Sequence, residues 1–192
     1  MQIIFLLSTL CISMATEKTV PKRYVPDHLS KRDKMIQKKG IIKSQKLYKK
    51  GKYAIREKVK SFKNKPSPHI IKAEKLYKTK TIKPSKELAK KTKCNIKGLQ
   101  KIFKKGQGAY YSSGSRPNQT PHSWAYARLA SSITGGKAAG VDYGILEEHC
   151  SKNSKALKLA KQSMKKYKKG MKRVPQVSLS YSKSKNKTRK FK

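Results

Sequence analysis

Apolar side chains recur along this chain at helical spacing, most clearly after residue 120. Thr120 and Pro121 are residue types that begin a helix. Four apolar residues then repeat at the spacing of one helical face: Tyr126, Leu129, Ala130 and Ile133. Gly135 and Gly136 follow and suit a helix end. The pattern predicts a helix that turns one side toward a core.

Three further helical stretches are rich in lysine. Ser30 and Asp33 have the spacing of a capping box, which predicts a helix to about Lys50. Its thin apolar side consists of Met35, Ile36, Ile42 and Leu47. A second stretch is predicted from Lys52 to Phe62, and a third from Ser154 to Lys169. Together with the helix after residue 120, they indicate a mainly α fold.

Residues 84–105 predict two helices joined by a turn near Lys93 and Cys94. The inward positions are Leu88, Ala89 and Thr92 in the first helix and Leu99, Ile102 and Phe103 in the second. This spacing resembles the helix-turn-helix family, in which a small residue, here Ala89, lets the helices cross closely. The family usually has glycine where Lys93 stands, and in this respect the sequence departs from the pattern.

The resemblance implies that the second helix is a recognition helix in the DNA major groove. Its asparagine and glutamine side chains suit adenine edges, and its lysines suit guanine or phosphate. The alternative is a plain helical hairpin with a solvated basic side. The predicted nucleic-acid-binding residues are Asn95, Lys97, Gln100, Lys101, Lys104, Lys105, Arg116 and Arg128.

Aromatic side chains are spaced among the lysines of the N-terminal half. They are Tyr48, Tyr53, Phe62 and Tyr77. One interpretation is that they stack on bases while lysines contact phosphates. The other is that they anchor thin helices to a small core. The sequence leaves both interpretations open.

The charge of the chain limits its possible functions. Fifty basic residues stand against nine acidic ones in 192, a net charge of +41, with a hydrophobic content of 35%. Such self-repulsion disfavours an ordinary enzyme that fills the whole length. We expect a polyanionic partner, with nucleic acid first, most of all DNA, and an anionic membrane or an acidic protein second. Residues 106–150 are the exception, with three basic and three acidic side chains.

This neutral block opens with a run rich in glycine and serine at residues 106–116. Gly106, Gly108 and Gly114 permit unusual backbone conformations. With Arg116 they suggest a loop that holds a phosphate, or alternatively a structural loop above Tyr110 and Tyr111.

No motif indicates catalysis, a cofactor or a metal. Gly136-Lys137 fails as a phosphate-binding loop because Ser131 and Ala138 stand where that motif needs glycine and serine or threonine. The three cysteines have no CxxC spacing, so we expect neither a zinc site nor a disulfide framework. We therefore expect a protein that is not an enzyme.

A longer motif spans residues 106–143, GQGAYYSSGSRPNQTPHSWAYARLASSITGGKAAGVDY. It resembles an uncharacterised domain of large and giant DNA viruses of eukaryotes, with similar segments in some bacteriophages. The likeness covers roughly residues 18–160. It implies a viral origin and a place in the virion or viral factory, but no catalytic residue. It also favours Met14 as the working start, since it begins after that residue.

The expected organisation is a small helical domain between basic, partly disordered arms. Residues 1–13 are an apolar extension or a signal-like segment, and only a true signal would imply secretion. Residues 14–69 form a basic N-terminal arm, 70–150 the helical domain with its Gly/Ser-rich loop, and 151–192 a basic helix and tail. No membrane contact is expected if Met14 is the start.

The expected function is DNA binding for compaction or packaging of a viral genome, in the virion, viral factory, host cytoplasm or nucleus. The alternative is a minor virion protein that docks onto capsid or core protein through residues 106–150. That alternative needs an exposed surface around Trp124.

Overall fold

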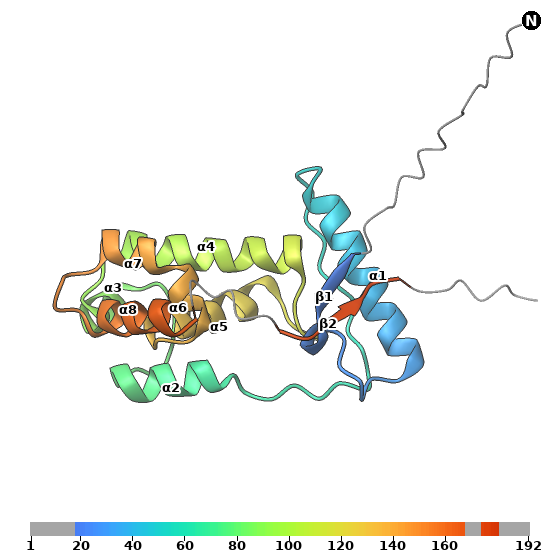
Figure 1. The fold of residues 1–192 in the computed structure, drawn as a ribbon, viewed down its shortest axis with the longest axis horizontal. Helices are drawn as coiled ribbons and strands as arrows, with labels where there is room; N and C mark the ends of the chain where they lie inside the picture. The colour runs from blue at the N-terminus through green and yellow to red at the C-terminus, as the bar shows by residue number, and fades with distance from the viewer. Residues whose placement is uncertain (1–17, 168–173, 181–192) are drawn as a thin grey trace, which may run out of the picture.

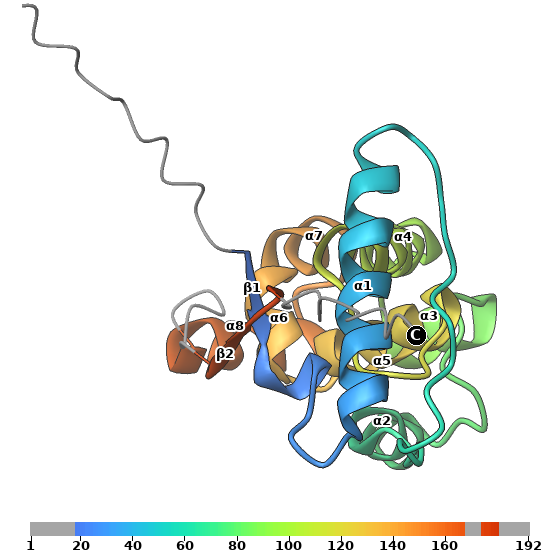
Figure 2. The same cartoon turned by 90° about the vertical axis from the view of Figure 1, so that its right-hand side faces the viewer.

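Two helices from the middle of the sequence form the centre of the fold, α4 (Ile96–Ser113) and α5 (Pro121–Ile133) (Figure 1). The computed structural model describes residues 18–167 and 174–180. α1 (Lys31–Tyr48) lies across the C-terminal end of α4, and Figure 2 shows it in front of the ends of the other helices.

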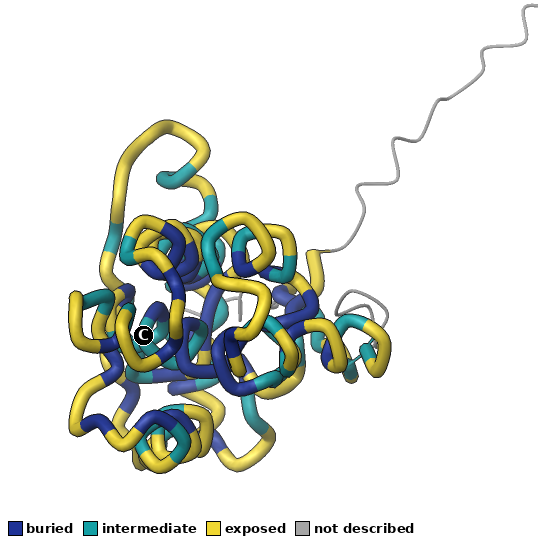
Figure 3. Tube along the Cα trace, turned by 90° about the vertical axis from the view of Figure 1, so that its left-hand side faces the viewer, coloured by how far each residue is buried: buried dark blue, intermediate teal, exposed yellow. Residues whose placement is uncertain are grey.

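Shorter elements surround this centre. They are α2 (Pro68–Tyr77), α3 (Lys86–Thr92), α6 (Lys137–Val141), α7 (Tyr143–His149) and α8 (Lys155–Tyr167). Each helix turns a buried side toward the centre and an exposed side outward (Figure 3). Two strands, β1 (Thr19–Pro21) and β2 (Gln176–Ser178), pair antiparallel with Val20 opposite Val177. Among the described residues, none of the helices combines the length and the hydropathy needed to cross a bilayer.

The main sequence predictions for helices are confirmed. α5 begins with the Thr120 cap and Pro121, and it ends before Gly135. α3 and α4 are the two predicted helices joined by a turn, and Lys93 takes the left-handed conformation, with φ 54°, at the position where the helix-turn-helix family usually has glycine. α8 is confirmed as far as Tyr167, whereas the predicted disordered tail lies almost wholly outside the described residues.

The predicted apolar side of α1 is wrong except at Ile42, which is partly buried against the core. The buried positions are Asp33, Gln37, Ile41 and Ser44, while Met35 is 40% exposed. Gln37 donates from Nε2 to the carbonyl oxygens of Tyr24 and Ser115 at 2.9 and 3.1 Å. The sequence does not mark this buried face of α1 by apolar residues, because most of its side chains are polar and are held by hydrogen bonds.

The predicted helix from Lys52 to Phe62 is also wrong, because this segment is irregular. The Arg56 guanidinium lies 3.6 Å from the centre of the Tyr110 ring. It donates to the Tyr110 carbonyl at 2.9 Å and to Ser115 Oγ at 2.5 Å. Burial lowers the pKa of Arg56, which has no carboxylate partner among the described residues. These long-range contacts replace the local hydrogen bonds of a helix.

The predicted Gly/Ser-rich loop at residues 106–116 is largely helix. α4 continues to Ser113, and only Gly114, with φ 92°, ends it. A Cβ atom at Gly106 would lie 2.7 Å from the Cα of Ala125. Gly106 therefore allows α4 and α5 to cross in close contact.

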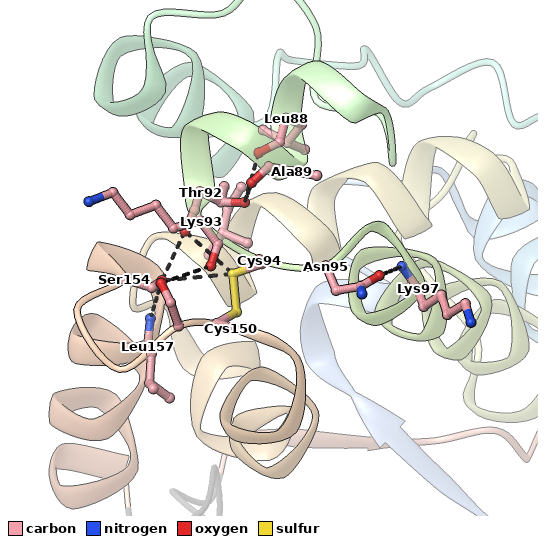
Figure 4. The surroundings of a disulfide bond; sticks show 12 residues. Leu88, Ala89, Thr92, Lys93, Cys94, Asn95, Lys97, Cys150, Ser154 and Leu157 are labelled. Carbon is pink, nitrogen blue, oxygen red and sulfur yellow. Dashed lines mark hydrogen bonds between the residues drawn. A yellow bond between two sulfur atoms is a disulfide. The ribbon is translucent and has the colours of Figure 1, made fainter.

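The expectation of no disulfide is wrong. Cys94, in the turn after α3, bonds to Cys150 at the end of α7 (Figure 4). The Asn95 N–H donates to the His149 carbonyl at 2.6 Å, and the Ser151 N–H donates to the Lys93 carbonyl at 3.0 Å. The disulfide and these hydrogen bonds join the turn between α3 and α4 to the segment between α7 and α8.

The division into a body and two arms also needs correction. α1 packs on α4, while α8 packs on α5, α6 and α7. Trp124 of α5 contacts Tyr24 edge-on, with ring centres 5.6 Å apart. The described parts of both expected arms therefore belong to one helical unit with the central residues.

We predict that Gly106→Ala lowers the free energy of unfolding by about 1–3 kcal/mol, because the new methyl group forces α4 and α5 apart. Urea unfolding measures the change. Gly144→Ala in α7 is the matched control, because no atom lies within 4 Å of its Cβ position. It should be neutral or stabilising. Equal losses in the two variants would contradict the close crossing.

We predict that reduction of the Cys94–Cys150 disulfide, which spans 56 residues, destabilises the fold. The expected loss is about 2–4 kcal/mol, because the reduced unfolded chain regains conformational freedom. Thermal unfolding with and without dithiothreitol measures it. The double variant Cys94→Ser, Cys150→Ser should be insensitive to the reductant, and an unchanged wild-type midpoint would refute the prediction.

Candidate nucleic-acid interface

The outward face of α4 is a row of exposed polar residues: Lys97, Gln100, Lys101 and Lys104. They follow helical spacing opposite the buried Leu99 and Ile102. Lys101 pairs with Glu148 of α7 at 3.2 Å. No described carboxylate pairs with Lys97 or Lys104. We call these four residues the α4 row.

Asn95 has a structural role at the start of this row. Its Oδ1 accepts a hydrogen bond from the Lys97 N–H at 2.9 Å, which caps α4 (Figure 4). Asn95 is exposed to solvent. The cap satisfies the Lys97 N–H and fixes the first turn of α4.

Two of the predicted binding residues, Lys105 and Arg128, pair with a buried carboxylate and do not belong to the α4 row. Arg128 donates from Nε and Nη2 to both carboxylate oxygens of Asp142, at 3.0 and 2.7 Å. Lys105 lies 2.9 Å from the same carboxylate, and Ser132 donates to it at 2.7 Å. The Asp142 side chain is fully buried. Arg128 and Lys105 therefore neutralise an internal charge, and we leave both out of the interface.

The environment of Asp142 acts on its pKa in two opposite directions. Burial raises the pKa because it disfavours the charged carboxylate. The hydrogen bonds and charge of Arg128, with Lys105 and Ser132, outweigh burial and hold the pKa below its ordinary value. Asp142 precedes the first residue of α7, but its side chain does not cap that helix.

Arg116 lies just beyond the opposite end of α4. It is exposed and lines a pocket of about 500 Å³. The pocket is also lined by residues outside the predicted site: His28, Ser61, Phe62, Lys63, Asn64, Lys65 and Gln119. Only Phe62, an aromatic residue among lysines, had been considered for nucleic-acid contact. We call this group of eight residues the Arg116 pocket.

The two surfaces are separated by the length of α4. Eighteen residues make a helix of about 27 Å. The predicted site residues therefore do not form one cluster: the α4 row lies along the helix from its first turn, and the Arg116 pocket lies past its last. Within residues 18–167 and 174–180, no group of three or more His, Cys, Asp or Glu side chains is placed to hold a metal ion.

The surface around Trp124 differs from what a docking site needs. Trp124 is half-buried and packs against a cluster that includes Val20, Tyr24 and Ile41. Segments from both ends of the described chain thus contribute to its surroundings, since Val177 and Leu179 also belong to the cluster.

We predict that Asp142→Asn destabilises the fold at neutral pH by about 3–5 kcal/mol, because Arg128 and Lys105 lose the charge that compensates them. The folded-state pKa of Asp142 is lowered. Its contribution to stability is therefore present above the unfolded pKa and is lost as pH falls through the folded pKa. Urea unfolding from pH 7 into acid should show less pH dependence in the variant. The exposed Asp27→Asn is the control and should change little.

Comparison with known proteins gives a single assignment. No curated protein and no solved structure matches this chain. Residues 21–149 match the model of a family of unknown function, DUF5824. The match covers more than half of the sequence and includes every helix from α1 to α7. The chain therefore belongs to the DUF5824 family.

Proposed function

We propose that this protein binds DNA without catalysing a reaction, and that it serves the compaction or packaging of a viral genome. The observation that carries the proposal is the α4 row on the second helix of a helix-turn-helix pair. Lysine and glutamine side chains project there from a rigid, capped helix over about 10 Å. Such a surface suits the major groove and the phosphates beside it.

The distribution of charge supports a polyanionic partner. Several carboxylates are paired within the chain, including those of Asp27, Glu87, Asp142 and Glu148. The outward sides of α1 and α8 add further exposed lysines, among them Lys43, Lys158 and Lys165. Positive charge on several faces favours compaction over the recognition of one sequence, since phosphate contacts carry no direct sequence information.

The viral setting comes from the resemblance of the motif at residues 106–143 to a domain of large DNA viruses. In that setting the polyanion is the viral genome, and the site of action is the virion or viral factory. Docking onto capsid or core protein through Trp124 is less well supported, because that side chain packs against Tyr24.

We predict that Lys97→Ala with Lys104→Ala weakens duplex DNA binding and lowers the salt slope of the logarithm of affinity by about two, because each removed lysine leaves one phosphate without its protein cation. A salt series with the full chain from Met14 and a fluorescent duplex measures it. Lys158→Ala with Lys165→Ala on α8 removes the same charge at the same seven-residue spacing.

The control pair should reduce binding less than the α4 pair. Equal losses would mean that total charge alone holds the duplex and that α4 is not the interface. Unchanged binding in the α4 pair would also exclude it. Circular dichroism of each variant establishes that the helices are retained.

A further inference from the structure

The Arg116 pocket combines cations, aromatic rings and amides from three separate segments. His28 precedes α1, residues 61–65 belong to the irregular segment before α2, and residues 116–119 link α4 to α5. Its volume of about 500 Å³ lies in the range of sites for small molecules. The pocket therefore has space for a ligand of the size of a nucleotide.

Its cations are available for an anion. Lys63, Lys65 and Arg116 are exposed, and none pairs with a carboxylate among the described residues. The acid joined to this pocket by hydrogen bonds is Asp33, which accepts from the Ser61 N–H and Oγ at 2.7 and 2.6 Å. That carboxylate is bound to the protein itself and does not compensate the three cations.

The pocket also has an aromatic platform. Phe62 is half-buried and stacks on the His28 ring, with ring centres 5.7 Å apart and planes inclined by 15°. Beside it, Gln119 Nε2 donates to Asn64 Oδ1 at 3.4 Å. Each of these amides has a second N–H, which suits the polar edge of a base.

The pocket is held in shape by hydrogen bonds of the Asn118 and Arg56 side chains. Asn118 takes the left-handed conformation with φ 57°. Its side chain accepts from the Val59 N–H at 2.7 Å and donates to the carbonyls of Val59 and Phe62, both at 2.9 Å. Arg56 fixes the same segment to Tyr110 and Ser115. Asparagine adopts the left-handed conformation readily, and the three hydrogen bonds of Asn118 fix residues 59–62 against the link between α4 and α5.

We propose that the Arg116 pocket binds an unpaired nucleotide, with its base on the Phe62–His28 platform and its phosphate on Arg116, Lys63 and Lys65. The base must be unpaired because a base within a duplex is stacked on both faces and cannot reach an aromatic side chain. The inference extends the proposed function and rests on it in taking a nucleic-acid strand as the source. A free nucleotide has the same chemistry, so the experiment includes both.

The experiment compares a fluorescent oligothymidylate with a duplex of equal length, using the full chain. Phe62→Leu should weaken oligothymidylate binding about tenfold, because the base no longer stacks on an aromatic ring, and should leave duplex binding unchanged. Phe62→Trp keeps an aromatic ring and should retain binding. Arg116→Ala should weaken oligothymidylate binding more than Lys158→Ala does.

Unchanged oligothymidylate affinity in Phe62→Leu, with its thermal midpoint retained, would overturn the proposal. An equal loss for the duplex would do the same, because the ring would then not distinguish an unpaired base. Should Phe62→Leu unfold, the other two variants decide. The proposal is overturned if Arg116→Ala keeps the wild-type affinity for oligothymidylate. It is also overturned if Phe62→Trp loses that affinity while its fold is intact.

The source of the nucleotide and the proposed function are tested separately. Displacement of the oligomer by thymidine monophosphate at comparable concentration would support the pocket and identify free nucleotide as its ligand. Displacement only by longer oligomers would support a strand. Absence of duplex binding by the wild type would refute the proposed function, whereas Phe62-dependent oligothymidylate binding would still support the pocket.

Discussion

The close crossing of α4 and α5 is the constraint on which the rest of the structure depends. Gly106 has no room for a Cβ atom against Ala125, so the two helices approach as nearly as their backbones allow. Lys105 and Arg128, on either side of this crossing, both reach the Asp142 carboxylate. The crossing thereby brings α4, α5 and the start of α7 together around one buried charge.

Polar contacts contribute much of the interior of this lysine-rich chain. Gln37 on α1 and Arg56 in the irregular segment are held by carbonyl and hydroxyl groups, most of them in the region at the end of α4. In a low-dielectric environment such hydrogen bonds are strong, and a buried donor without a partner is costly. Together with the buried side chains of Val20, Tyr24 and Ile41, these hydrogen bonds give residues 18–62 a defined position on the body. The excess lysines, in contrast, remain on the outward sides of the helices.

The two basic surfaces differ in shape, and this difference separates the two proposals. The α4 row is a convex helix face, suited to a groove in a duplex. The Arg116 pocket is concave and has an aromatic platform, which suits a base that has left its stack. Because α4 is about 27 Å long, only a polyanionic ligand of comparable length could contact both surfaces at once. In the proposed function, such separation lets one molecule engage paired and unpaired regions of a genome.

Periodicity and capping residues in the sequence alone determined α5, the α3–α4 pair, α8 and the extent of α1, because these signals lie within one or two helical turns. The exposed α4 row followed from the same spacing. Only the tertiary structure decided the buried face of α1, the Cys94–Cys150 bond, the pairing of Arg128 with Asp142, and the pocket around Arg116. Each of these depends on residues distant in the sequence, and the polar ones carry no hydrophobic pattern. The irregular path of residues 52–62 shows the same limit, since Arg56 gains its partners only when α1 and α4 are already packed.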